Sequence, residues 1–260
     1  IQGLHFEFTN VPKISPTKVY LRISLINTNI MDEAFEAFTV TVLNNIQYLD
    51  TSLEVLETIS QIVVDYEQFF NSEKQRRLTR QEEQGLFGEL LFLKEAISKK
   101  GEEVVDAWTG PDKNKHDFIF QSNCGVEIKT TSSQIQKNIS ISNETQLKFE
   151  DRNKLFLKLY VLESNPNGES IVDLYNEILE NLSSVLLKKH LLQKILEFGI
   201  LPQSYVPKYK FVNIESAIYL VDEKFPRISK GSLANVIFDV KYKVNVDSVL
   251  TFKGDIYDTI

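Results

Sequence analysis

His116-Asp-Phe-Ile-Phe-Gln-Ser-Asn-Cys-Gly-Val-Glu-Ile-Lys-Thr-Thr131 is the stretch that decides the fold. Its apolar residues on either side of Ser-Asn-Cys-Gly predict two short strands joined by a tight turn. Side chains alternate between the faces of a strand, so Glu127 and Lys129 project together while their apolar neighbours face the other way. A hairpin would bring Asp117 back toward both, with the register open by one residue. We interpret this group of charges beside a hydrophobic layer as a catalytic cluster.

Composition limits what such a cluster could serve. The chain has 260 residues, 42% of them hydrophobic, enough for one large domain or two small ones. No run approaches the roughly 18 to 20 apolar residues that span a bilayer, and the first residues lack the pattern of a signal peptide, so we expect a cytoplasmic protein with no membrane partner. The single cysteine, Cys124, excludes an internal disulfide and a cysteine-based zinc cage. The three histidines are scattered, so a metal would need oxygen ligands.

The net charge of −7 would argue against a nucleic acid, but the charge is unevenly distributed. Acidic residues dominate the first 72 positions, whereas the part that contains the hairpin is close to neutral. Binding to a phosphate backbone depends on local positive patches, so a nucleic-acid partner stays open.

The N-terminal part predicts two strands followed by two helices. Residues 4–9 and 18–26 have strand composition and flank a turn with two prolines. Apolar residues then recur at steps of three and four over residues 35–49 and 53–70, which predicts two amphipathic helices packed as a hairpin about residues 50–52. We interpret these helices as scaffold.

A third helix begins at Thr79, where Thr-Arg-Gln-Glu82 is a capping-box pattern, and ends at Gly101. Gly85 and Gly88 each cost a helix about 1 kcal/mol relative to alanine, which suggests close approach of another backbone. Glu89 follows in an apolar run. Such a carboxylate is either at an exposed edge or is buried with a partner or a metal.

The remaining elements are read from shorter signals. We expect a strand at 104–108, a polar loop at 109–115, a strand at 139–142, a brief helix capped by Asn143 that holds Gln146, and a buried strand at 155–162. Beyond these we expect a turn at 165–168, helix over 171–198 in two pieces about residues 181–184, and strands at 208–221 and 235–246.

The order of these residues and elements resembles a known superfamily. Gly88-Glu89-Leu, then Asp117, then Glu127-Ile-Lys129 is similar to the PD-(D/E)XK nucleases. The runs 85–93, 110–111 and 116–131 resemble a prokaryotic group within it, the domain of unknown function 4420. The resemblance covers about residues 30 to 165, and one departure is His116, where the superfamily usually has proline before the first acid.

This resemblance implies an α/β protein with a restriction-endonuclease-like core, a central mixed sheet flanked by helices. Its parts would be N-terminal strands and a helical hairpin at 1–78, the nuclease core at 79–165, and C-terminal helices and strands at 166–260. It implies a Mg²⁺-dependent DNA endonuclease, with Mn²⁺ as a substitute, whose catalytic residues are Glu89, Asp117, Glu127 and Lys129. Oxygen ligands suit magnesium, so Asp117 and Glu127 would hold the ion, and the resemblance adds Glu89.

The same resemblance implies the partners. Members of the group lie among restriction and phage-defence genes, so we expect DNA, a second copy of the chain, and other proteins of a defence system as partners. A catalytically inactive DNA-binding or adaptor subunit with the same fold remains the alternative.

Several residues carry weaker signals. Asp239-Val-Lys241 has the same acid-x-Lys form on a plausible strand, but it lacks the preceding helix and is interpreted as a decoy. Gln146 is either a contact to the DNA backbone or a solvent-facing helix residue, and Trp108 is expected in the core. His116 is either a phosphate contact or a structural histidine at a strand edge. Further candidates for phosphate contact are Lys113, Lys115, Thr130 and Lys137.

Overall fold

The computed structural model describes residues 4–15, 17–25, 32–70, 77–110, 115–132, 136–202, 205–228, 233–234, 236–237 and 239–260. The chain forms two compact units. The first contains residues 1–77 and 198–206, and the second contains residues 78–197 and 207–260. The separation of a nuclease core at 79–165 from residues 166–260 stays a prediction.

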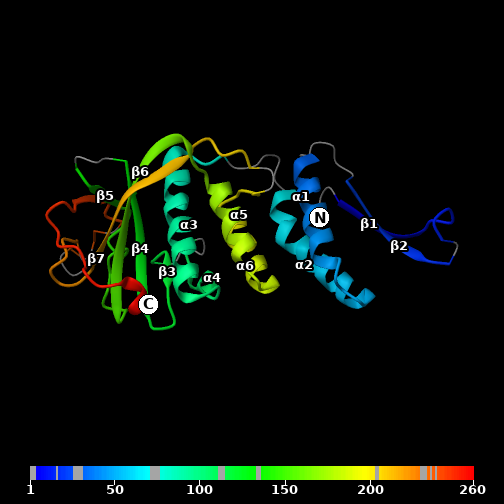
Figure 1. Ribbon diagram of the computed structural model, residues 1–260, viewed down its shortest axis with the longest axis horizontal. Coiled ribbons are helices and arrows are strands. Elements are labelled where there is room, and N and C mark those ends of the chain that lie inside the picture. The colour runs from blue at the N-terminus through cyan, green and yellow to red at the C-terminus, as the bar shows by residue number, and fades with distance from the viewer. Residues whose placement is uncertain are drawn as a thin grey trace. The chain divides into compact units, whose positions relative to one another are not determined.

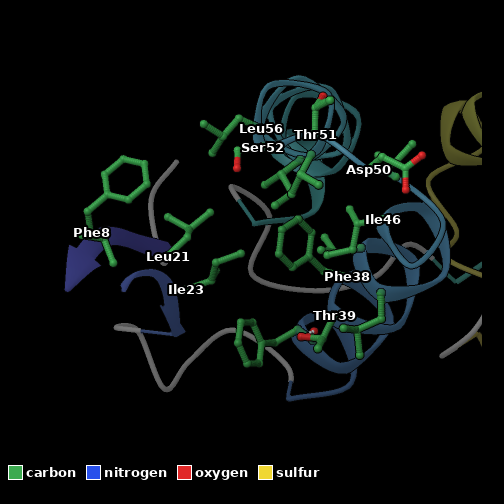
Figure 2. Close-up of a pocket in the computed structure, with 17 residues that line it drawn as sticks. Phe8, Leu21, Ile23, Phe38, Thr39, Ile46, Asp50, Thr51, Ser52 and Leu56 are labelled. Atoms are coloured by element: carbon green, nitrogen blue, oxygen red, sulfur yellow. Dashed lines mark hydrogen bonds between the residues drawn. The ribbon is translucent and has the colours of Figure 1, made fainter. Parts of the chain in front are cut away.

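The first unit consists of a β-hairpin and a helical hairpin. Strands β1 (Leu4–Asn10) and β2 (Val19–Leu25) pair antiparallel, and helices α1 (Asp32–Ile46) and α2 (Ser52–Phe70) pack against each other. Both predicted strands and both predicted helices are confirmed. An apolar cavity of about 740 Å³ lies between the two hairpins, with Phe8 and Leu21 on the strand side and Phe38 and Leu56 on the helix side (Figure 2).

The second unit is built on a four-stranded sheet with the order β3-β4-β6-β7. Its strands are β3 (Phe118–Ile119), β4 (Cys124–Thr131), β6 (Lys154–Glu169) and β7 (Phe211–Leu220). The β4–β6 pair is parallel and the other two pairs are antiparallel, so the sheet is mixed. Alternate residues of β6 are buried on both faces of the sheet, which explains why its first half reads as a continuous apolar run.

Helices cover one face of this sheet. Figure 1 shows α3 (Arg80–Lys100) alongside β4, with α5 (Ile171–Asn181) on the other side of α3. The short helix α4 (Val104–Ala107) contacts α3 and also α6 (Val185–Glu197). The predicted capping box is present at Thr79 and Glu82, and α3 ends at Gly101 as expected.

Gly88 explains how close α3 comes to the sheet. A Cβ atom at this position would overlap Thr130 Cγ2 and lie 3.3 Å from Ile128 Cγ2, both on β4. At Gly85 a Cβ atom would meet none of the described residues within 4 Å outside its own helix. Close approach is therefore confirmed for Gly88, although the neighbours are side chains of a strand rather than a backbone, and the inference was wrong for Gly85.

A second, two-stranded sheet covers the opposite face. Strands β5 (Asn138–Ile141) and β8 (Tyr242–Asn245) pair antiparallel. Their apolar residues form a core with Leu155, Leu157 and Leu159 of β6 and with Tyr219 of β7. Near the C-terminus, the short 3-10 helix η2 (Ile256–Asp258) contacts α3 on the helical face. The main sheet is thus buried on both sides, which confirms the predicted α/β architecture of a central mixed sheet flanked by helices.

Four of the local predictions were wrong. Residues 104–107 form helix α4 instead of a strand, because Val104 and Val105 are buried by packing that outweighs their strand preference. Residues 165–168 stay within β6 at a register irregularity instead of forming a turn. Residues 143–147 form turns without a helix, and among the described residues of the predicted strand 235–246 only Tyr242–Asn245 form a strand, residues 235 and 238 lying outside the described residues.

Candidate active site

The hairpin of β3 and β4 sets the geometry of the candidate site. Phe118 pairs with Val126, and the chain reverses at Asn123, whose φ of 57° is tolerated by asparagine. Asp117 precedes β3, and its Oδ2 accepts a hydrogen bond of 2.7 Å from the backbone N–H of Ile128. This bond ties the Asp117 carboxylate to β4. The predicted hairpin is confirmed, and the open register is resolved.

Glu127 and Lys129 lie on the same face of β4 and form an ion pair. Lys129 Nζ lies 2.7 Å from Glu127 Oε1, and the side chains are 13% and 1% exposed. The second oxygen, Glu127 Oε2, is buried and has no hydrogen-bond partner among the described residues. A buried carboxylate oxygen without a donor is costly, so this atom can accept a further donor or a cation.

Glu89 reaches the same cluster from α3. Its Oε2 accepts a hydrogen bond of 2.7 Å from Trp108 Nε1. The Asp117 and Glu127 carboxylates both act on its charge, which places Glu89 in the electrostatic neighbourhood of the hairpin. The exposed-edge alternative for Glu89 is wrong, because this carboxylate is partly buried and has a specific donor.

The four charged groups perturb one another strongly. Burial, followed by the nearby Asp117 charge, raises the pKa of Glu89 well above its ordinary value and raises the pKa of Glu127 to about 8. Burial also raises the pKa of Asp117, although Lys129 and the Ile128 N–H oppose it. Burial disfavours the ammonium of Lys129, but the Glu127 and Asp117 carboxylates outweigh this effect and raise its pKa. Three acids thus share the one ammonium of Lys129, and their carboxylates repel one another when ionised.

Gln146 also belongs to this cluster. Lys129 Nζ donates to Gln146 Oε1 at 3.2 Å, and the backbone N–H of Ser142 donates to the same oxygen at 2.8 Å. Gln146 lies in a turn after β5 and is half-buried, so its interpretation as a solvent-facing helix residue is wrong. It gives Lys129 a neutral acceptor beside the charged one.

The expected phosphate contacts have other partners in the structure. Lys115 pairs with Asp151 at 2.9 Å, Lys137 pairs with Glu215, and Thr130 Oγ1 accepts from Gln84. Lys113 lies outside the described residues. Contacts of these residues with phosphate stay a prediction.

His116 and Trp108 are buried. His116 is 1% exposed, and burial together with the Arg152 and Lys115 charges lowers its pKa to about 4, so it is neutral near pH 7. Trp108 is fully buried, as expected for the core, but its bond to Glu89 was not foreseen. A buried indole N–H requires an acceptor, and this requirement was the available signal.

The decoy motif lies elsewhere. Asp239 has a positive φ of 55° and Lys241 precedes β8, so neither residue stands on a regular strand. The Val240 N–H between them donates to Glu144.

The donor atoms of the cluster fit a hard divalent cation. Within the described parts of the chain, no three His, Cys, Asp or Glu side chains already form a metal-binding group. Magnesium, however, keeps several waters and is commonly held by one or two carboxylates. Asp117 and Glu127 supply these carboxylates, and the unpartnered Glu127 Oε2 is the acceptor that a cation would satisfy.

The central mixed sheet is flanked by helices, and it carries an acid before one strand and Glu-x-Lys on the next. These features define the restriction-endonuclease-like fold of the PD-(D/E)XK class. The chain belongs to the family described as "Putative PD-(D/E)XK family member, (DUF4420)", whose model matches residues 6–247. No curated protein and no solved structure shows significant similarity to the chain. Among the described residues, no helix is both long and apolar enough to cross a membrane.

Proposed function

We propose that this protein is a Mg²⁺-dependent endonuclease that hydrolyses phosphodiester bonds of DNA. One observation carries the proposal: Glu89, Asp117, Glu127 and Lys129, drawn from a helix and two paired strands, interact in one buried cluster. Three acids face one ammonium there, and one buried carboxyl oxygen has no donor among the described residues. Family membership supports the same class of reaction.

The residues would divide the reaction as follows. Asp117, Glu127 and Glu89 would hold the metal ion, which on binding would activate a water and neutralise charge on the phosphate. Lys129 would orient the attacking water and stabilise the charge that develops on phosphorus-bound oxygen. Water loses one proton and forms a bond to phosphorus, the bond from phosphorus to the departing sugar oxygen breaks, and that oxygen takes up one proton.

Gln146 would support this role of Lys129. The ammonium is held between Glu127 Oε1 and Gln146 Oε1, at 2.7 and 3.2 Å. With two acceptors the ammonium keeps a fixed position, and its third N–H is available for the water or the phosphate.

DNA as substrate, a role in restriction or phage defence, and a second copy of the chain as partner follow from the resemblance to nucleases. Cutting both strands with one active site per chain would require two copies. The competing function is a DNA-binding or adaptor subunit that kept the fold without cleavage. Retention of a buried, mutually repelling acid cluster favours the enzyme, because such a cluster is costly without a ligand.

The test is cleavage of supercoiled plasmid DNA in Mg²⁺, in Mn²⁺ and with a chelator, by the wild type beside Asp117→Asn and Lys129→Met. We expect nicked or linear DNA only with a metal ion, and a rate at least about 100-fold lower for each variant, the scale for removing one electrostatic stabiliser. Matched controls are Asp239→Asn and Lys241→Met, which make the same chemical changes in the decoy motif and should cleave as the wild type does.

The outcomes separate the two functions. A wild-type protein that shifts DNA in a gel but never cleaves it would support the binding subunit, and one that does neither would support the adaptor. Equal loss of activity in the decoy variants would refute the assignment of the site.

A further inference from the structure

We propose that the segment Trp108–Gly110 is a positioning device that fixes the Glu89 carboxylate relative to Asp117, and so sets the affinity of the site for a divalent cation. This inference rests on the proposed function. It assigns to Trp108 and Gly110 a role beyond packing, in which they act on the metal ligands without being ligands themselves.

The indole of Trp108 holds the Glu89 carboxylate. Trp108 is fully buried, and its Nε1–H donates to Glu89 Oε2 at 2.7 Å. The ring stacks on Phe118 of β3, with centroids 6.5 Å apart, and the Trp108 backbone forms an isolated antiparallel bridge with the same residue. The donor is therefore fixed in place by the hairpin that carries Asp117.

The next two residues, Thr109 and Gly110, hold the backbone at Asp117. The backbone N–H groups of Thr109 and Gly110 both donate to the carbonyl oxygen of Asp117, at 2.8 and 2.9 Å. Thr109 Oγ1 also donates to the carbonyl of His116 at 2.9 Å. Of these three consecutive residues, Trp108 thus binds Glu89 through its side chain. Thr109 and Gly110 bind the carbonyl oxygens of residues 116 and 117. The separation of the two acids is then set by one short stretch of chain.

Gly110 leaves the space that the Glu89 carboxylate occupies. A Cβ atom at position 110 would overlap Glu89 Oε2 and lie 3.3 Å from Trp108 Nε1. The carboxylate is the end of a flexible side chain, so an alanine there would displace it rather than disrupt the fold. The hydrogen bond to Trp108 would be lost in that displacement.

Helix α6 contacts the segment and the residues just before it. Lys194 donates to the carbonyl oxygen of Trp108, and His190 Nδ1 lies 2.7 Å from Asp106 Oδ1 on α4. These contacts anchor the chain immediately before and at the indole. Partners that orient a metal ligand in this way typically change metal affinity or activity 10- to 100-fold when they are removed.

The sharpest test uses the fact that the chain has one tryptophan. Global replacement of tryptophan by 3-benzothienylalanine, in which sulfur takes the place of the indole N–H, alters only Trp108 and removes only the donor. We expect Mn²⁺ binding, measured from the loss of the free-ion EPR signal, to weaken about 10- to 100-fold, while the protein still unfolds in urea in one cooperative transition at a somewhat lower urea concentration, because one buried hydrogen bond is lost. Equal Mn²⁺ affinity in the two proteins would overturn the inference.

A second pair of variants tests Gly110 independently. Gly110→Ala should weaken Mn²⁺ binding by a similar factor, and Gly85→Ala, a glycine change on the helix of Glu89 with open space around it, should not. If Gly110→Ala binds Mn²⁺ as the wild type does, the positioning role is refuted. A wild-type protein that neither binds Mn²⁺ nor cleaves DNA would overturn the proposed function and this inference with it, whereas a cleaving wild type with insensitive variants overturns the inference alone.

Discussion

Two glycines three residues apart on α3 give a matched pair of perturbations. Gly85→Ala adds a methyl group where no described residue outside the helix lies within 4 Å. Gly88→Ala adds the same group closer than 3.0 Å to Thr130 Cγ2 and 3.3 Å from Ile128 Cγ2. Both substitutions gain about 1 kcal/mol of helix propensity, so this term cancels in the comparison. What remains is the cost of the methyl group at the contact with β4.

The neighbours at Gly88 cannot yield easily. Thr130 and Ile128 are β-branched, and Thr130 Oγ1 also accepts a hydrogen bond of 3.2 Å from Gln84. Overpacking of this kind costs about 1 to 3 kcal/mol. We therefore expect Gly85→Ala to be more stable than the wild type by about 1 kcal/mol, and Gly88→Ala to be less stable than Gly85→Ala by about 1 to 3 kcal/mol.

Urea unfolding followed by Trp108 fluorescence measures this difference, because Trp108 lies in the same unit as α3. In a thermal scan, each 1 kcal/mol should appear as a shift of about 2 to 4 °C for a unit of this size. Displacement of Thr130 would also disturb the adjacent Lys129, so Gly88→Ala should cleave DNA more slowly than Gly85→Ala. Equal unfolding midpoints for the two variants would refute the reasoning on close approach.

Three further predictions concern the site and its helix. The pKa of Glu127 is raised from 4.5 to about 8, so its contribution to stability is complete below pH 4.5 and is lost as the pH rises through 8. The urea concentration at which half of the metal-free protein is unfolded should thus be lower at pH 8 than at pH 5. If Glu127→Gln shows the same decrease between these pH values as the wild type, the prediction is contradicted. Gln146→Ala should slow plasmid cleavage about 10-fold or more, the effect of losing one hydrogen bond from a charged donor, and a wild-type rate would exclude its support of Lys129. Thr79→Ala should lower stability by about 1 kcal/mol in urea unfolding through loss of the capping box, whereas a change within error would show that α3 needs no cap.

The core of the site was predictable because its signals are local. The hairpin is encoded by strand composition around a turn, and alternation alone places Glu127 and Lys129 on one face. The start of α3 is encoded by Thr79 and Glu82, which bond each other directly. These features require no knowledge of distant residues.

The errors arose where distant packing decides the local structure. Gly168 suggested a turn, but a Cβ atom there would overlap the carbonyl of Phe211, so the glycine permits close pairing of β6 with β7. The contact of Gln146 with Lys129 and that of Trp108 with Glu89 join residues 17 and 19 positions apart. Such pairings depend on how the chain folds back and are not specified by any single segment.

The burial of Cys124 has a practical consequence. It is the chain's one cysteine, it is 1% exposed, and burial raises the pKa of its thiol to about 11. Thiolate, the form that reacts with maleimides and iodoacetamides, is therefore scarce at neutral pH. A cysteine introduced on the surface can then be labelled with a fluorophore without first removing the native one.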